Sequence, residues 1–121
     1  MEKLTQPEEE AMQVLWLLGR GFTKDVREHL SDPKPPYTTL ASTVKNLERK
    51  GYVSGEKLGN SYLYTPLINA EDYRKEFMNS FIGSYFRNSY KELVSFFAKE
   101  QKISAEELKE IIEMIEKGKA N

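Results

Sequence analysis

Apolar residues recur at helical spacing over most of the chain, and the interruptions of this pattern divide it into short elements. Thr5 and Glu8 have the spacing of a capping box, and Gly19 ends the pattern that follows them. The apolar positions between them are Ala11, Met12, Leu15 and Leu18. These features predict a first helix over residues 5–18.

Two further helices are predicted on either side of a proline-rich connector. Thr23 is a plausible N-cap for a short helix that ends near Leu30. Residues 31–36 contain three prolines, which remove backbone donors and favour extended conformations before them. From residue 38 to residue 50 the apolar positions are Leu40, Val44 and Leu47. This i, i+4, i+7 spacing predicts a third helix, with Gly51 as its stop.

Beyond Gly51 the period changes from that of a helix to that of strands. Residues 52–58 and 61–65 are short segments rich in aromatic and apolar side chains, and Gly59-Asn60 separates them. A two-residue Gly-Asn loop suits a hairpin with a type I′ or II′ turn. Pro66 closes the second strand, where we expect an edge position to tolerate its missing donor.

The rest of the chain is predicted to be helical, with a break near Asn88-Ser89. Ser104 and Glu107 form a capping box for the last helix, whose pattern ends before Gly118. The apolar stripe of these helices contains Tyr73, Phe77, Phe81, Tyr85, Leu108, Ile111, Ile112 and Ile115. We therefore expect a first domain over residues 1–67 and a helical second domain over residues 68–121. The stripe forms either a private core of one chain or an interface with a second copy.

Length and composition exclude several classes of protein. The chain has 121 residues and no cysteine, so it has no disulfide scaffold, thiolate metal site or cysteine nucleophile. Its longest apolar run, residues 14–18, is too short for a signal sequence or a membrane span, which leads us to expect a cytoplasmic protein without membrane insertion. The single His29 supports neither a metal cluster nor a catalytic pair, so we expect no enzymatic activity, metal or cofactor.

The net charge of −1 gives no global argument for a polyanionic partner, but the local charge differs. Residues 34–65 contain five basic and two acidic residues. Within that window, the face of the third helix opposite its apolar positions carries Thr38, Thr39, Ser42, Thr43, Asn46, Arg49 and Lys50. The predicted hairpin adds Lys57, Asn60, Ser61 and Tyr62 at its tip. Short polar side chains can approach base edges in the major groove, and a hairpin can touch the adjacent backbone.

The order of three helices and a hairpin, with this polar face, predicts a mostly α fold with a small β wing. We interpret it as a winged helix-turn-helix domain, followed by further helices, that binds double-stranded DNA. Two alternatives remain open. The winged helix could serve as a protein–protein adaptor, or the aromatic stripe of the second domain could enclose a small ligand.

Four segments of the chain resemble the penicillinase repressor family of winged-helix transcriptional regulators. They are residues 4–16, with Glu8-Glu9-Glu10-Ala11-Met12; residues 37–44, Tyr-Thr-Thr-Leu-Ala-Ser-Thr-Val; residues 47–53; and residues 62–67. The resemblance implies a homodimeric repressor on a palindromic operator, with C-terminal dimerisation helices of two subunits interlocked. The apolar stripe is then the dimerisation surface.

The chain departs from the family pattern in two ways. In the beta-lactam-responsive members a membrane sensor peptidase triggers cleavage at an Asn-Phe bond, and the corresponding pair here is Phe96-Phe97. This difference argues against induction by that cleavage. Copper-responsive members carry cysteines near the C-terminus, and this chain has none, which excludes copper sensing through thiolates.

Overall fold

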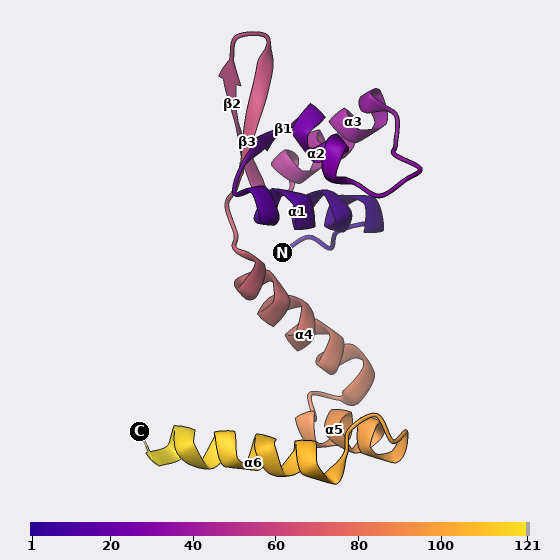
Figure 1. Ribbon diagram of the computed structural model, residues 1–121, viewed down its shortest axis with the longest axis vertical. Helices are drawn as coiled ribbons and strands as arrows, with labels where there is room; N and C mark the ends of the chain where they lie inside the picture. The colour runs from indigo at the N-terminus through magenta and orange to yellow at the C-terminus, as the bar shows by residue number, and fades with distance from the viewer. Residues whose placement is uncertain (121) are drawn as a thin grey trace. The chain divides into compact units, whose positions relative to one another are not determined.

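The computed structural model describes residues 1–120, and the side chains of residues 1–118. The elements are α1 (Gln6–Leu18), β1 (Gly21–Phe22), α2 (Thr23–His29), α3 (Tyr37–Arg49), β2 (Val53–Leu58), β3 (Ser61–Pro66), α4 (Ala70–Phe86), α5 (Tyr90–Lys99) and α6 (Ala105–Ala120) (Figure 1). They form two compact units, of which the first ends at Arg74 and the second begins at Lys75. The prediction of a mostly helical fold with a small sheet is confirmed.

Hydrogen bonds to N-cap residues define where α1 and α2 begin. The N-cap of α1 agrees with the prediction and that of α2 does not. The Thr5 hydroxyl accepts a hydrogen bond from the Glu8 backbone N–H, and the Glu8 carboxylate accepts one from the Thr5 N–H at 2.8 Å, which completes the predicted capping box. The predicted N-cap of α2, Thr23, is wrong. Phe22 is the N-cap because it is still extended in β1, and its N–H donates to Asp25 at 3.0 Å.

The sheet has three antiparallel strands in the order β1-β3-β2, so β3 is central. In the wing, Leu58 pairs with Ser61 and leaves the two-residue loop Gly59-Asn60, as predicted. Gly59 has a φ of 64°, as the first central residue of a type II′ turn requires. The sequence gives no sign of β1, because two residues carry no periodicity. Strand β3 is central, but β1 pairs only with residues 63 and 64, so Pro66 is paired on one side alone, with Val53 of β2. Its missing donor falls at such a local edge position, as expected.

The hydrophobic core of the first unit lies between α1, α2, α3 and the sheet. Its fully buried side chains include Met12, Leu15, Val26, Val44 and Leu47. Helix α3 starts at Tyr37 and ends at Arg49, one residue earlier at each end than predicted, and buries the three predicted apolar positions. Burying side chains of this size stabilises the unit by roughly 1.5–3 kcal/mol each.

The first unit extends past residue 67, where the sequence placed its boundary, because the start of α4 packs on it. The indole N–H of Trp16 donates to the Ile68 carbonyl at 2.8 Å. The Tyr73 ring lies 5.4 Å from that of Trp16 and 5.9 Å from that of Tyr52, between centroids. Edge and tilted arrangements of aromatic rings at these distances are favourable.

The second unit consists of the rest of α4 with α5 and α6. Arg87 and Asn88 adopt positive φ angles between α4 and α5, at the predicted break. Ser104 and Glu107 exchange the two hydrogen bonds of a capping box at 3.0 Å each, as predicted for α6. The helix itself continues past the apolar pattern, to Ala120. Among the described side chains of this unit, Ile82 is the buried apolar residue.

Candidate nucleic-acid interface

Helix α3 presents a polar face to solvent. Thr38, Thr39, Ser42, Asn46 and Arg49 are exposed, and Thr43 is half-buried. These residues lie on the side away from the buried positions because a helix turns by about 100° per residue. Six of the seven residues predicted for this face therefore lie there.

The small side chains of this face are held close to the helix backbone. The Ser42 hydroxyl donates to the Thr38 carbonyl at 3.2 Å, and the Thr43 hydroxyl donates to the Thr39 carbonyl at 3.1 Å. Each oxygen keeps its lone pairs for an outside donor. Such a surface permits close approach of another molecule to the helix, and it can accept as well as donate hydrogen bonds.

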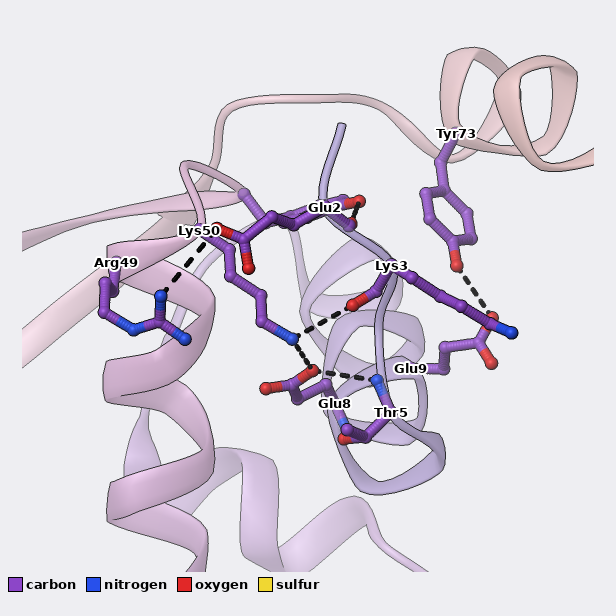
Figure 2. A network of polar contacts seen from close by, with 9 residues as sticks. Glu2, Lys3, Thr5, Glu8, Glu9, Arg49, Lys50 and Tyr73 are labelled. Carbon is purple, nitrogen blue, oxygen red and sulfur yellow. Dashed lines mark hydrogen bonds and ion pairs between the residues drawn. The ribbon is translucent and has the colours of Figure 1, made fainter. Parts of the chain in front are cut away.

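Lys50 is the exception, since its ammonium group does not lie on the exposed face. Its side chain is 9% exposed, and Nζ lies 2.6 Å from Oε1 of Glu8 and 3.0 Å from the Lys3 carbonyl (Figure 2). Lys50 is the C-cap of α3, and its side chain extends to Glu8 on α1 instead of into solvent. The prediction of Lys50 as part of the exposed face is therefore wrong.

The partner of Lys50 is held in its charged form. Burial of Glu8 opposes ionisation, but hydrogen bonds from Lys50 and from the Thr5 backbone outweigh it and lower the pKa of Glu8 below its ordinary value. The sequence suggests only that Glu8 stabilises the first turn of α1. Its 42-residue separation from Lys50 leaves no local signal for their pairing.

Arg49 is a solvent-exposed cation on the polar face of α3. Its Nη1 lies 3.8 Å from Oε1 of Glu2, and both side chains are about 60% exposed, at 62% and 59% (Figure 2). An exposed pair of this kind is worth about 0–1 kcal/mol, so a stronger anion can displace Glu2.

The wing brings three of its predicted residues, Lys57, Asn60 and Tyr62, to the surface. Lys57 and Tyr62 face each other across β2 and β3, one pair before the Leu58–Ser61 pair that flanks the turn, and Ser61 is also exposed. A cation, an amide and a phenol thus gather at one end of the hairpin.

Lys45 belongs to this surface and is absent from the residues that the sequence singled out. It is exposed on α3, three residues after Ser42 and four before Arg49. Its Nζ lies 4.4 Å from the centre of the Tyr62 ring and 3.6 Å from Oε1 of Glu48. The i+3 and i−4 spacing could have revealed its face, whereas the contact with the wing depends on tertiary structure.

Tyr73 does not belong to the apolar stripe to which the sequence assigned it. Its hydroxyl donates to Oε2 of Glu9 at 2.8 Å (Figure 2), within the first unit. Burial, together with the Glu9 carboxylate, raises the pKa of Tyr73, so the hydroxyl stays a donor. Its assignment to a dimerisation surface is corrected for this reason.

The other stripe residues lie in the second unit and are largely open to solvent. Phe77 is 45% exposed, Tyr85 74%, Ile111 42%, Ile112 52% and Ile115 54%, whereas Phe81 and Leu108 are half-buried. Phe96 and Phe97 lie on α5, and both are exposed.

A metal site and a membrane-spanning helix each have structural requirements that the described residues do not meet. Within residues 1–118, His, Asp and Glu side chains form no group of three or more that could hold a metal ion. His29 is exposed, and its Nδ1 lies 2.9 Å from the Asp25 carbonyl. In the part of the chain that the structure describes, no helix is both long and apolar enough to cross a bilayer.

Three helices followed by a β-hairpin, with a polar third helix beside that hairpin, define a winged helix-turn-helix protein. The class narrows to one family when the whole sequence is compared with known proteins. The penicillinase repressor family model matches residues 4–117, and the chain belongs to this family.

Individual relatives agree with this assignment. The penicillinase repressor of Bacillus licheniformis is 28% identical over 97% of this chain and 92% of its own length. The methicillin resistance regulatory protein MecI of Staphylococcus epidermidis is 20% identical, over 95% and 94%. The solution structure of the DNA-binding domain of the repressor BlaI matches with a TM-score of 0.50 and 31% identity, and covers 60% of this chain and 94% of that domain.

Proposed function

We propose that the protein is a transcriptional repressor that binds a palindromic operator as a homodimer. Helix α3 enters the major groove, with Thr38, Thr39, Ser42, Thr43, Asn46 and Arg49 facing the DNA, and the β2–β3 wing contacts the backbone through Lys57, Asn60 and Tyr62. The observation that carries the proposal is the exposed polar face of α3 beside a hairpin that carries Lys57, Asn60 and Tyr62 near its turn.

The roles of individual residues follow from their chemistry. The Asn46 amide can form paired hydrogen bonds with adenine, and Arg49 can meet guanine or phosphate after leaving Glu2. Lys50 is not part of the proposed DNA contact, because its ammonium group is paired with Glu8.

The dimeric state is supported by the second unit. Several large apolar side chains of this unit are exposed to water: Phe77, Tyr85, Ile111, Ile112 and Ile115. Exposed apolar surface of this kind is typical of an interaction site when it is contiguous. A two-fold dimer would cover this surface and set two α3 helices in successive major grooves, about 34 Å apart.

A fluorescence-anisotropy titration tests the proposal. The protein is titrated against the DNA upstream of its own gene and against scrambled DNA, over a series of salt concentrations. We expect tight, salt-dependent binding to the upstream DNA, with two chains per site. Equal, weak and salt-insensitive binding to both duplexes would contradict the proposal and favour a protein–protein adaptor.

Two variants distinguish recognition of the base sequence from binding to the phosphate backbone. Asn46→Ala should reduce the preference for operator over scrambled DNA, by about 10-fold if a bidentate contact of 1–3 kcal/mol is lost. Arg49→Ala should weaken binding to both duplexes and flatten the salt dependence if Arg49 meets phosphate. Arg74→Ala is the matched control, because Arg74 is exposed outside α3 and the wing.

A further inference from the structure

A cluster of side chains joins α3 to the wing, and we call it the helix–wing clasp. It consists of Lys45 and Glu48 on α3, Gly55 on β2, and Tyr62 and Tyr64 on β3. We propose that the helix–wing clasp holds the wing against the recognition helix, and that Lys45 is a positioning residue for the DNA contacts of the wing. This inference rests on the proposed function.

The contacts of Lys45 reach both elements. The ammonium lies 4.4 Å from the centre of the Tyr62 ring on β3, and 3.6 Å from the Glu48 carboxylate on its own helix. The Tyr62 and Tyr64 rings stack with centroids 6.3 Å apart. One cation therefore bridges an anion on the helix and an aromatic face on the wing, which attracts it through the ring quadrupole.

Gly55 allows the two elements to approach this closely. A Cβ atom at this position would lie 2.9 Å from Oε2 of Glu48 and 3.0 Å from Cε1 of Tyr64. Gly55 pairs with Tyr64 across the strands, and the Tyr64 ring is buried, so it cannot move away freely. Any side chain at residue 55 would thus push the wing away from α3 or displace Glu48.

The helix–wing clasp lies far enough from the turn of the hairpin that a small change in the clasp moves the turn by a larger distance. The turn at Gly59 lies four residues beyond Gly55, which is about 13 Å along an extended strand. A small tilt at Gly55 is therefore amplified at Lys57 and Asn60. Lys45 also neutralises Glu48, whose carboxylate would otherwise repel a phosphate backbone near α3.

The first experiment asks whether the helix–wing clasp exists in the free protein. In NMR spectra of the full chain, the ε-methylene protons of Lys45 should be shifted upfield by the Tyr62 ring, and Tyr62→Leu should remove the shift. Tyr37→Leu is the matched control, because Tyr37 is an exposed tyrosine at the other end of α3. A Lys45 signal unaffected by Tyr62→Leu would overturn the proposal without any reference to DNA.

The second experiment is a double-mutant cycle on operator binding. If Lys45 positions the wing, Lys57→Met should lose at least half of its effect on the logarithm of Kd when Lys45 is already Met. Arg49→Met and Lys57→Met should instead multiply independently, as a control pair. Lys45→Arg, which keeps a cation over the ring, should restore the effect of Lys57→Met.

A variant without a charge change separates positioning from electrostatics. Gly55→Ala should reduce the effect of Lys57→Met as Lys45→Met does, whereas Ser54→Ala, an exposed neighbour on β2, should not. Independent effects of Lys45 and Lys57, with the salt slope reduced by about one for Lys45→Met alone, would make Lys45 a separate phosphate contact and overturn the proposal.

These outcomes are distinguishable from failure of the proposed function. If the wild-type protein shows no preference for the operator, the repressor assignment fails and the positioning role fails with it. The NMR result then still decides whether the helix–wing clasp is present.

Discussion

The helices of both units have similar apolar patterns in the sequence, but these apolar faces are buried in the first unit and largely exposed in the second. In the first unit, the apolar faces of α1, α2 and α3 meet one another and the sheet, and Met12 and Leu15 are fully buried. In the second unit, most apolar side chains of α4, α5 and α6 stay in contact with solvent, among them Tyr90, Val94, Phe96, Phe97 and Met114. Periodicity therefore shows which face of a helix is apolar, but it does not show what covers that face.

This difference separates two kinds of stability. The first unit has a core of its own, so its free energy of unfolding depends on side chains within one chain. Under the proposed function, the second unit completes its core with a second copy, so its stability depends on protein concentration.

The largest effect is expected from removal of a core side chain in the first unit. Leu15→Ala should lower the free energy of unfolding by about 2–5 kcal/mol, because the residue is fully buried and leaves a cavity. Urea denaturation followed by the fluorescence of Trp16 measures it. Leu17→Ala is the control on the same helix, since Leu17 is 76% exposed and should change stability by less than about 0.5 kcal/mol.

A charge on the apolar face of α6 should act on assembly instead. Under the proposed function, Ile115→Asp should weaken the dimer at least about 30-fold, as for loss of a central interface residue, and leave the unfolding of the first unit unchanged. Analytical ultracentrifugation measures the dimer. Glu113→Gln, on the opposite face of α6, should have no effect. An unchanged sedimentation coefficient for Ile115→Asp would indicate that the second unit closes within one chain.

The Glu8–Lys50 pair provides a pH test of the first unit. Because the pKa of Glu8 is lowered in the folded protein, the pair contributes stability above the ordinary pKa of about 4.5, and this contribution is lost as the pH falls through the folded value. Glu8→Gln should cost about 1–3 kcal/mol at pH 7. The difference from wild type should shrink as the pH falls below the ordinary pKa of 4.5, whereas Glu10→Gln, at an exposed position, should match wild type throughout.

The smallest effect is expected where the first turn of α4 packs within the first unit. Tyr73→Phe keeps the ring contacts with Trp16 and Tyr52 but removes the hydrogen bond to Glu9, which should cost about 1 kcal/mol in the unfolding of the first unit. Tyr85→Phe, at a 74% exposed position, is the control and should cost nothing measurable. Equal stabilities of the two variants would show that the Tyr73 hydroxyl contributes nothing to this contact.

Features with a local signal could be predicted from the sequence. The capping boxes at Thr5 and Ser104, the turn at Gly59 and the apolar positions of α3 all depend on residues within a few positions of one another. Helix ends and the two-residue strand β1 could not be predicted to the residue, because tertiary pairing of Phe22 with Leu63 decides where β1 ends and α2 begins.

The candidate site was predictable as a face but not as a set of contacts. Spacing placed Thr38, Ser42, Asn46 and Arg49 on one side of a helix. It could not show that Lys50 turns back to Glu8, since a buried ion pair between residues 42 positions apart depends on how α1 packs on α3. The same holds for Lys45, whose contact with Tyr62 exists only once the wing has folded back.

The exposed apolar face of α6 also affects how operator occupancy depends on the concentration of the protein. If that face is covered by a second copy, as we propose, the dimer is set by mass action, and below its dissociation constant it rises with the square of the chain concentration. A moderate fall in synthesis or rise in degradation then produces a larger fall in operator occupancy. Repression would then respond to the protein concentration with a threshold. The side chains that set this threshold, Ile111, Ile112 and Ile115, are far along the chain from any residue proposed to touch DNA.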